Sequence, residues 1–175
     1  DHWRCSRCWF DIDVASSVPA GATITAATFN IKGRTYSPGF GKVLGDFDSI
    51  LIKGNYDSSS AMTTQDVDQF VGFEAGWDED DVTEYSEELT TWNHSSDASA
   101  DNQFTMTADA ITDMNTHLNA ETKFQFVWME HTYDYGDIAP SNSSIRTSAN
   151  YYTIRETTTG HRPYMAITYV TTAPS

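Results

Sequence analysis

The chain is short of positive charge, of cysteine and of long apolar runs, and each shortage excludes a class of protein. With two cysteines and five prolines in 175 residues, it is neither a disulfide-stapled scaffold nor a collagen-like chain. No stretch approaches the ~20 consecutive apolar residues that cross a bilayer. The sequence begins at Asp1, with no basic and apolar signal segment after it. We therefore expect a soluble chain, either processed or a fragment of a longer one.

Basic residues number ten against 25 acidic residues, so the net charge is -15. This charge repels nucleic acid phosphates and anionic membranes, so we expect neither as a partner. It also keeps a protein soluble in salt and supplies oxygen ligands for calcium. Together with 23 threonines and 17 serines, it indicates an extracellular or virion protein from a salty setting. A solvated acidic surface without a specific ligand is the simpler interpretation of the charge.

Apolar residues alternate with a period of two along most of the chain, which is typical of half-buried strands. In the second strand the inward phase switches near Ala26, which predicts a bulge there. We expect about eight strands, a number typical of sandwiches and barrels. The clearest fall at residues 9–14, 24–31, 49–55, 103–106, 122–132, 151–155 and 164–170.

One helix is predicted among the strands. Thr107 can cap a helix over Ala108–Leu118, with Ala108, Ile111, Asn115 and Leu118 on one stripe. The pattern as a whole predicts an all-β, antiparallel, jelly-roll-like β-sandwich whose end is plugged by this short helix. We expect a single domain over residues 1–170 and a C-terminal tail over residues 171–175.

Four segments of the sequence resemble one family. They are Cys8–Asp13, Val18–Ile24, Ala27–Ile31 and Arg162–Tyr169. They are similar to the DNRLRE, disaggregatase-related jelly-roll domain, in which a strand ends in Phe-Asp, a Pro-x-Gly-Ala-x-Ile turn follows, and a Pro-x-Leu-x-Ile-x-Tyr strand closes the fold. The resemblance implies a non-catalytic module, like alginate-binding carbohydrate modules or surface and virion proteins of phages. Segments like Glu130–Tyr135 recur in the phage proteins.

The chain departs from the family pattern at its start. Family domains carry a further strand before the Phe-Asp strand, whereas this chain begins shortly before Phe10. Three alternatives are open: the strand is dispensed with, it lies outside this sequence, or a neighbouring subunit donates it. The last alternative would make the protein a polymer subunit, and we expect a homo-oligomer.

No enzyme motif is present in the sequence. The five histidines are scattered, and none belongs to a metalloprotease or nucleophile-elbow motif. Two carboxylates across a cleft could hydrolyse a glycoside, but a sequence does not show their separation. Since the resemblance also implies a non-catalytic module, we expect no catalytic residues.

Clustered carboxylates make calcium the most plausible cofactor, in a structural role. The candidate ligands are Asp78, Asp80 and Asp81, which follow Trp77 together with Glu79, and Asp134 and Asp137, which flank Gly136. A third candidate is the pair Asp11 and Asp13 on one strand face. Adjacent carboxylates that simply stay hydrated are the alternative at each place.

Cys5 and Cys8 form a CxxC pair with no second pair, too few ligands for structural zinc. In an extended strand their Cα atoms would lie roughly 10 Å apart, beyond disulfide reach. We therefore expect reduced or separately bonded thiols, with a disulfide only if the chain turns there.

Aromatic side chains in loops or on the outer strand phase could contact a sugar or a protein neighbour. The candidates are Trp9, Tyr36, Phe40, Trp92, Tyr133, Tyr135 and Tyr151. We expect a non-catalytic extracellular or virion module, such as a decoration, fibre or filament subunit, that presents a β-sandwich surface to neighbouring subunits or glycans. The alternative is a carbohydrate-binding module of a secreted polysaccharide-degrading enzyme; a stand-alone glycosidase or lyase is a third possibility.

Overall fold

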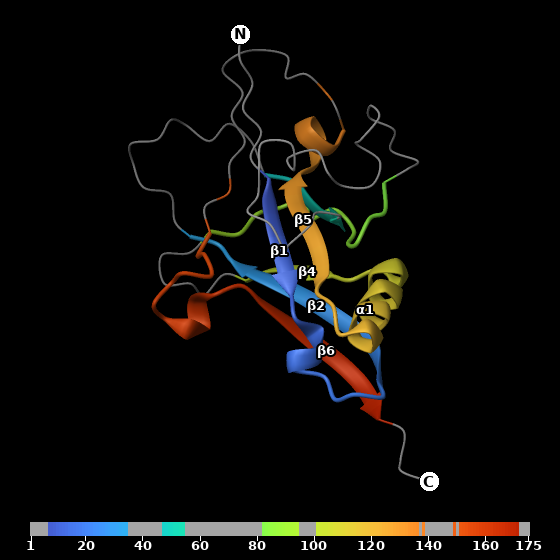
Figure 1. The fold of residues 1–175 in the computed structure, drawn as a ribbon. Coiled ribbons are helices and arrows are strands. Elements are labelled where there is room, and N and C mark those ends of the chain that lie inside the picture. Colours follow the sequence, from blue (N-terminus) through green and yellow to red (C-terminus); the bar gives the residue numbers. More distant parts are fainter. Residues whose placement is uncertain are drawn as a thin grey trace.

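The computed structural model describes residues 7–34, 47–54, 82–94, 101–136, 138, 149 and 151–171. These residues form two antiparallel three-stranded sheets that pack together as a β-sandwich, with one short helix (Figure 1). The sandwich predicted from the period-two alternation is confirmed. No helix in the described part of the chain is long and apolar enough to cross a membrane.

Each sheet consists of a central strand and two edge strands. The first sheet has the order β1-β5-β3, and the second has the order β4-β2-β6. The strands are β1 (Cys8–Ile12), β2 (Ala22–Lys32), β3 (Ser49–Lys53), β4 (Asp101–Thr105), β5 (Phe124–Glu130) and β6 (Tyr164–Thr171). The described residues thus contain six of the roughly eight strands expected for this class.

Aromatic rings from both sheets meet at the centre of the core. The ring of Phe29 in β2 lies 4.8 Å, centroid to centroid, from the rings of Phe10 in β1 and Phe126 in β5. Both contacts are edge-to-face, a geometry that adds about 0.5–1.5 kcal/mol beyond the buried area. Phe124 and Trp128 share the inner face of β5 with Phe126, as the alternation predicted.

The predicted bulge in β2 is confirmed. The pairing of β2 with β6 shifts register between Ile24 and Ala26. The extra residue lets Ile24, Ala27 and Phe29 all face the core, although they are not in one alternating phase; their exposures are 2 %, 4 % and 1 %.

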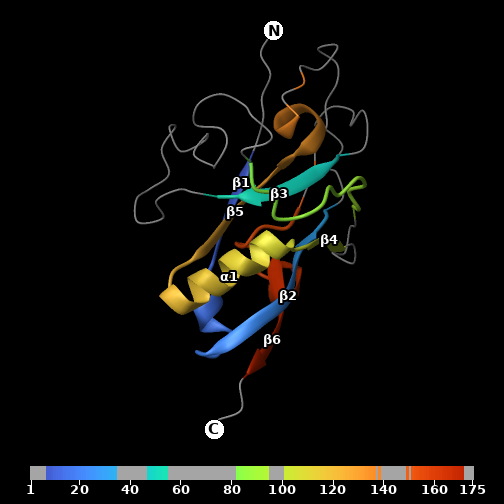
Figure 2. The ribbon, with the colours of Figure 1, turned by 90° about the vertical axis from the view of Figure 1, so that its right-hand side faces the viewer.

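Helix α1 (Ala108–Ala120) begins where the sequence predicted. The Thr107 side chain accepts a hydrogen bond from the Ala110 N–H at 3.3 Å. The helix ends two residues later than predicted, because Glu121, with φ of 54°, supplies a left-handed cap. Figure 2 shows α1 running alongside β2, which it contacts.

The buried stripe of α1 differs from the predicted one. Ala110, Met114 and Leu118 are buried, whereas Ala108 is exposed in the first turn. Asn115, predicted on the apolar stripe, is half-buried and bonds the backbone of β2. The helix is therefore held to the sheet by a polar contact as well as by apolar packing.

The end of one predicted strand and the whole of another are wrong. Val14 lies in a 3-10 turn, η1 (Val14–Ser16), because Asp13 caps that turn by accepting a hydrogen bond from the Ser16 N–H at 3.2 Å. Residues 151–155 are not a strand: Tyr151 makes one isolated bridge to Gly33. A backbone turn then closes from the Glu156 N–H to the Thr153 carbonyl at 3.0 Å.

Candidate functional site

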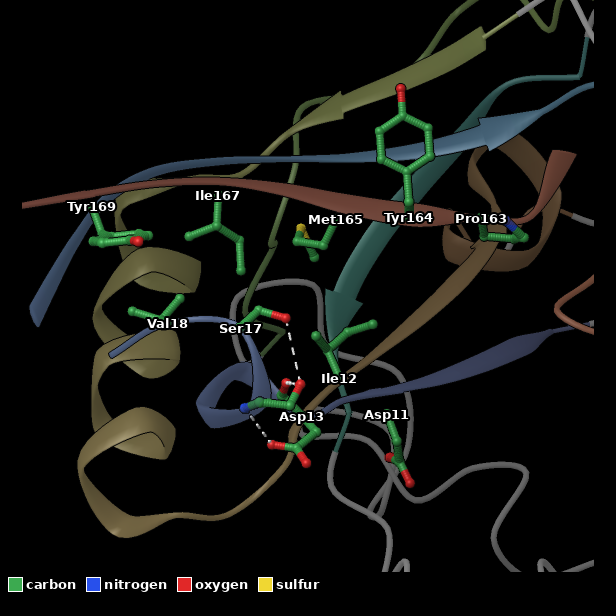
Figure 3. Close-up of a pocket in the computed structure, with 11 residues that line it drawn as sticks. Asp11, Ile12, Asp13, Ser17, Val18, Pro163, Tyr164, Met165, Ile167 and Tyr169 are labelled. Atoms are coloured by element: carbon green, nitrogen blue, oxygen red, sulfur yellow. Dashed lines mark hydrogen bonds between the residues drawn. The ribbon is translucent and has the colours of Figure 1, made fainter. Parts of the chain in front are cut away.

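The sandwich is open on one side, between β1 and β6. Within the described residues β1 pairs only with β5, and β6 pairs only with β2, so both are edge strands. A groove of about 400 Å³ lies between them, bounded by β1, η1 and its following turn on one side and by β6 on the other (Figure 3).

Inward-facing side chains of β6 form one wall of this groove. Met165 and Ile167 are paired with the core-facing Phe29 and Ala27 of β2, so they point to the same side of the sheet. Both are nevertheless only half-buried, and Tyr169 is 39 % exposed. Figure 3 shows these three side chains directed from β6 toward η1 and the end of β1.

The opposite wall combines apolar and acidic groups. Ile12 and Val18 belong to the apolar part, while Asp11 and Asp13 supply the carboxylates. Asp13 is engaged in capping η1, and the Nζ of Lys123 lies 3.9 Å from Oδ2 of Asp11. No group of three or more His, Cys, Asp or Glu side chains in the described ranges is arranged to hold a metal ion.

The strand β6 carries no charged residue, although 20 % of the chain is charged. Tyr164 and Val170 on its outer side are 45 % and 57 % exposed. Natural edge strands are usually protected against pairing by lysine, proline, bulges or a cover. Among the described residues, β6 is an uncharged, eight-residue strand with a partner on one side only, and such an edge is suited to binding another chain.

The part of the second sheet's outer face that lies next to β6 continues this uncharged surface, and the ion pair Lys32–Asp101 lies at the end of β2 beyond it. Next to β6, the outward positions of β2 are hydroxyl-bearing or small, and the Thr25 hydroxyl donates to the Thr168 carbonyl at 3.3 Å. Exposed residues of this face are Thr23, Thr25, Ala26, Gln103, Thr105, Ala166 and Thr168. The signal in the sequence is the uncharged run from 164 to 171, which predicts a strand but not its position in the sheet.

Two of the predicted ligand-binding aromatics pack in or against the core. Trp92 is 6 % exposed and stacks on Trp128, with their ring centroids 5.0 Å apart. Tyr151 is half-buried, and its ring meets Trp128 edge-on at 5.1 Å. Trp92 was predicted to expose its ring, and the structure shows that the ring is buried instead.

Cys8 is a free thiol beside Tyr151, and its Sγ lies 3.0 Å from the tyrosine oxygen. Burial raises the pKa of Cys8, although the hydrogen bond with Tyr151 acts in the opposite direction. The pKa of Tyr151 is also raised, by burial and by the neighbouring thiol. The reactive thiolate is therefore disfavoured. Cys5 lies outside the described residues.

Asp134, a predicted calcium ligand, is bound by an arginine. It lies in the π-helical turn η4 (His131–Tyr135), and its two oxygens accept hydrogen bonds from Nε and Nη2 of Arg7 at 2.9 and 2.7 Å. The side chains of Arg7 and Asp134 are 11 % and 5 % exposed. This bidentate pair joins the beginning of β1 to η4.

Glu130 caps the same turn. Its Oε2 accepts hydrogen bonds from the N–H groups of Tyr133 and Asp134 at 2.6 and 3.0 Å. Burial raises the pKa of Glu130 despite these bonds, which act to lower it. Tyr133 is half-buried, and Tyr135 is 7 % exposed with its hydroxyl donating to Glu84 at 2.6 Å.

Trp9 is half-buried on the outer face of the first sheet. It packs against a second apolar cluster made of Ile50, Ile52, Val127, Met129 and Tyr135. The remaining candidates lie outside the described residues: Tyr36, Phe40, Asp78, Asp80, Asp81 and Asp137.

A polar cluster joins β3 to α1. Oδ2 of Asp113 accepts hydrogen bonds from Lys53 Nζ at 2.6 Å and from the Tyr85 hydroxyl at 2.5 Å. Burial acts to raise the pKa of Asp113, but these two hydrogen bonds prevail and lower it. The pKa of Tyr85 is raised, chiefly by burial, and burial lowers the pKa of His117. The cluster lies outside the lining of the groove.

The groove between β1 and β6 is the candidate site because it combines an open volume, exposed apolar side chains and a strand edge that no other described strand pairs with. Comparison of the chain with family models, with curated proteins and with solved structures finds no match.

Proposed function

We propose that the chain is a non-catalytic structural or adhesion module of an extracellular or virion surface, which joins a neighbouring protein chain along the open edge of its second sheet. The observation that carries this proposal is the strand β6, which is exposed and uncharged in a chain of net charge -15. Backbone hydrogen bonds along such an edge, with apolar side chains entering the groove, would supply the affinity.

The chemistry of the groove supports a binding role over a catalytic one. Its ionisable lining consists of Asp11, Asp13 and tyrosines, with no histidine, cysteine or lysine among the lining residues that the structure describes. Asp13 is committed to capping η1. A nucleophile activated by a neighbouring base, which covalent catalysis needs, is not part of this lining.

A second candidate function is carbohydrate binding, and Tyr169 is the observation that favours it. Its ring is 39 % exposed in the groove, across from Ser17 and Asp13 on the opposite wall. Sugar C–H groups could stack on the ring while sugar hydroxyls bond the polar groups. A structural calcium on the carboxylate loops would be compatible with either function.

Light scattering of the purified chain, with and without a chelator, tests the proposal. We expect particles larger than the 19.5 kDa monomer. Thr168→Lys in β6 should reduce the particle mass, whereas the control Asn119→Lys, which adds the same charge on the exposed side of α1, should not. A monomer at every concentration contradicts the proposal, and a monomer that binds alginate establishes the second candidate. Loss of stability only with chelator identifies a structural calcium.

A further inference from the structure

The inner side of β6 matches the groove that lies beside it. A strand that was added to the edge of β6 would face Ile12 and Val18 on the far wall of the groove, so its inward side chains should be apolar. Within the chain, β6 has this pattern itself: Met165, Ile167 and Tyr169 point inward, and no charge interrupts the strand. The edge is therefore complementary to a second copy of the same strand.

We propose that two copies of the chain join by antiparallel pairing of β6 with β6 about a twofold axis, so that their second sheets form one continuous six-stranded sheet. An isologous contact of this kind is the commonest way in which identical chains associate. The proposal deepens the proposed function and rests on it, because it names the neighbour as a second copy.

The pattern of side chains selects the register. Directly opposite residues of an antiparallel pair have side chains on the same face of the sheet. The twofold axis must therefore lie where one residue faces the same residue of the second copy, since an axis between two neighbouring residues would set an inward side chain opposite an outward one. With the axis at Ile167, Met165 faces Tyr169 of the second copy on the groove side. On the outer side Tyr164 then faces Val170, which are the two most exposed apolar side chains of β6, at 45 % and 57 %. An axis at Thr168 would instead place Met165 opposite Thr171.

The charge distribution favours a second copy at this edge. Two chains of net charge -15 repel each other, and the repulsion is smallest where the surface carries no charge, as along β6 and the adjoining face of β2. Asp11 and Asp13 remain close to the junction and oppose association. Because salt screens like-charge repulsion, the dimer should strengthen as salt rises, whereas a basic foreign strand would bind more weakly.

Disulfide trapping tests the pairing and its register in the full chain with Cys5 and Cys8 replaced by serine. Opposite Cα atoms in an antiparallel pair lie about 4.5–5.5 Å apart, within the range that a disulfide spans. Ile167→Cys should form a covalent dimer under mild oxidation. Met165→Cys and Tyr169→Cys should cross-link to each other when mixed, and more slowly when alone. Asn119→Cys on α1 is the control: it leaves β6 unchanged and should form no covalent dimer.

Each outcome decides between the proposals. Two results together support β6 pairing. The first is a covalent dimer of Ile167→Cys. The second is a dissociation constant of the cysteine-free dimer that falls as salt rises and that Thr168→Lys increases about tenfold or more. A large particle that cross-links at none of these positions and ignores Thr168→Lys overturns the pairing but leaves the proposed function intact. A monomer at all concentrations and salts overturns both. Circular dichroism of each cysteine variant confirms that the sandwich is folded before oxidation.

Discussion

The side-chain amide of Asn115 in α1 bonds both backbone polar groups of Ile24 in β2. Its Oδ1 lies 2.9 Å from the Ile24 nitrogen, and its Nδ2 lies 3.0 Å from the Ile24 oxygen. The strand β4 pairs with β2 only over Thr28–Lys32, so on the side of β2 away from β6 the amide takes the place of a strand partner at Ile24.

Replacing Asn115 by leucine should therefore destabilise the fold. The change keeps the side-chain volume but leaves two backbone groups without their partner, at a cost of about 2 kcal/mol. Urea unfolding measures the loss, with Asn119→Leu on the exposed side of the same helix as the control. Equal unfolding midpoints for the two variants would show that water replaces the amide at Ile24.

Breaking the Arg7–Asp134 pair should destabilise the chain strongly. Asp134→Ala removes the carboxylate that accepts from both Nε and Nη2 of this buried guanidinium, and breaking a buried ion pair typically costs about 3–5 kcal/mol. The double variant Arg7→Met with Asp134→Leu should recover much of the loss, because both charges of the pair are removed together. Thermal unfolding with and without chelator checks this prediction. If chelator destabilises the parent but not Asp134→Ala, Asp134 binds calcium in solution and the ion pair does not account for its role.

Acid should weaken the contact between α1 and β3. The pKa of Asp113 is lower in the fold than in the unfolded chain, so its contribution to stability is present above the ordinary aspartate pKa of about 3.9. That contribution is lost as pH falls through the lowered pKa. Melting temperatures of the parent and of Asp113→Asn, measured from pH 7 down to pH 2, should converge toward the acid end. A constant difference across this range would be evidence against the assignment.

Gly33 should tolerate no side chain. A Cβ built there would lie 1.7 Å from the carbonyl oxygen of Asn93, which is backbone and is held by hydrogen bonds to Asn102. Gly33→Ala must shift one of these segments, and overpacking of this kind costs about 1–3 kcal/mol. Gly160→Ala, with no atom within 4 Å of the added carbon, is the matched control. Similar melting temperatures for the two variants would contradict the close approach.

Much of the fold could be predicted because local patterns determine it. The alternation of Phe124, Phe126 and Trp128 places one side of β5 in the core whichever strands lie beside it. The bulge followed from two incompatible phases in β2, and the helix start followed from Thr107. These predictions needed no knowledge of distant contacts.

The candidate site could not be predicted in the same way, because it depends on strand order. Nothing in the run from 164 to 171 shows that β6 lies at an edge, or that β1 lies across the groove from it. The burial of Trp92 could not be predicted for a related reason, because the ring that covers it belongs to Trp128 on a strand distant in the sequence. Residues 151–155 favour a strand by composition, yet the Thr153 hydroxyl accepts from the Arg155 N–H at 3.2 Å and stabilises a turn.

The most direct measurement is the particle mass of the purified chain by light scattering, over a range of protein concentrations at low and high salt. Pairing through β6 predicts a mass of twice 19.5 kDa that becomes more populated as salt rises, and a monomer for Thr168→Lys under the same conditions. A parent that stays monomeric throughout, or a dimer that Thr168→Lys leaves unchanged, would contradict the assignment of β6 as the interface.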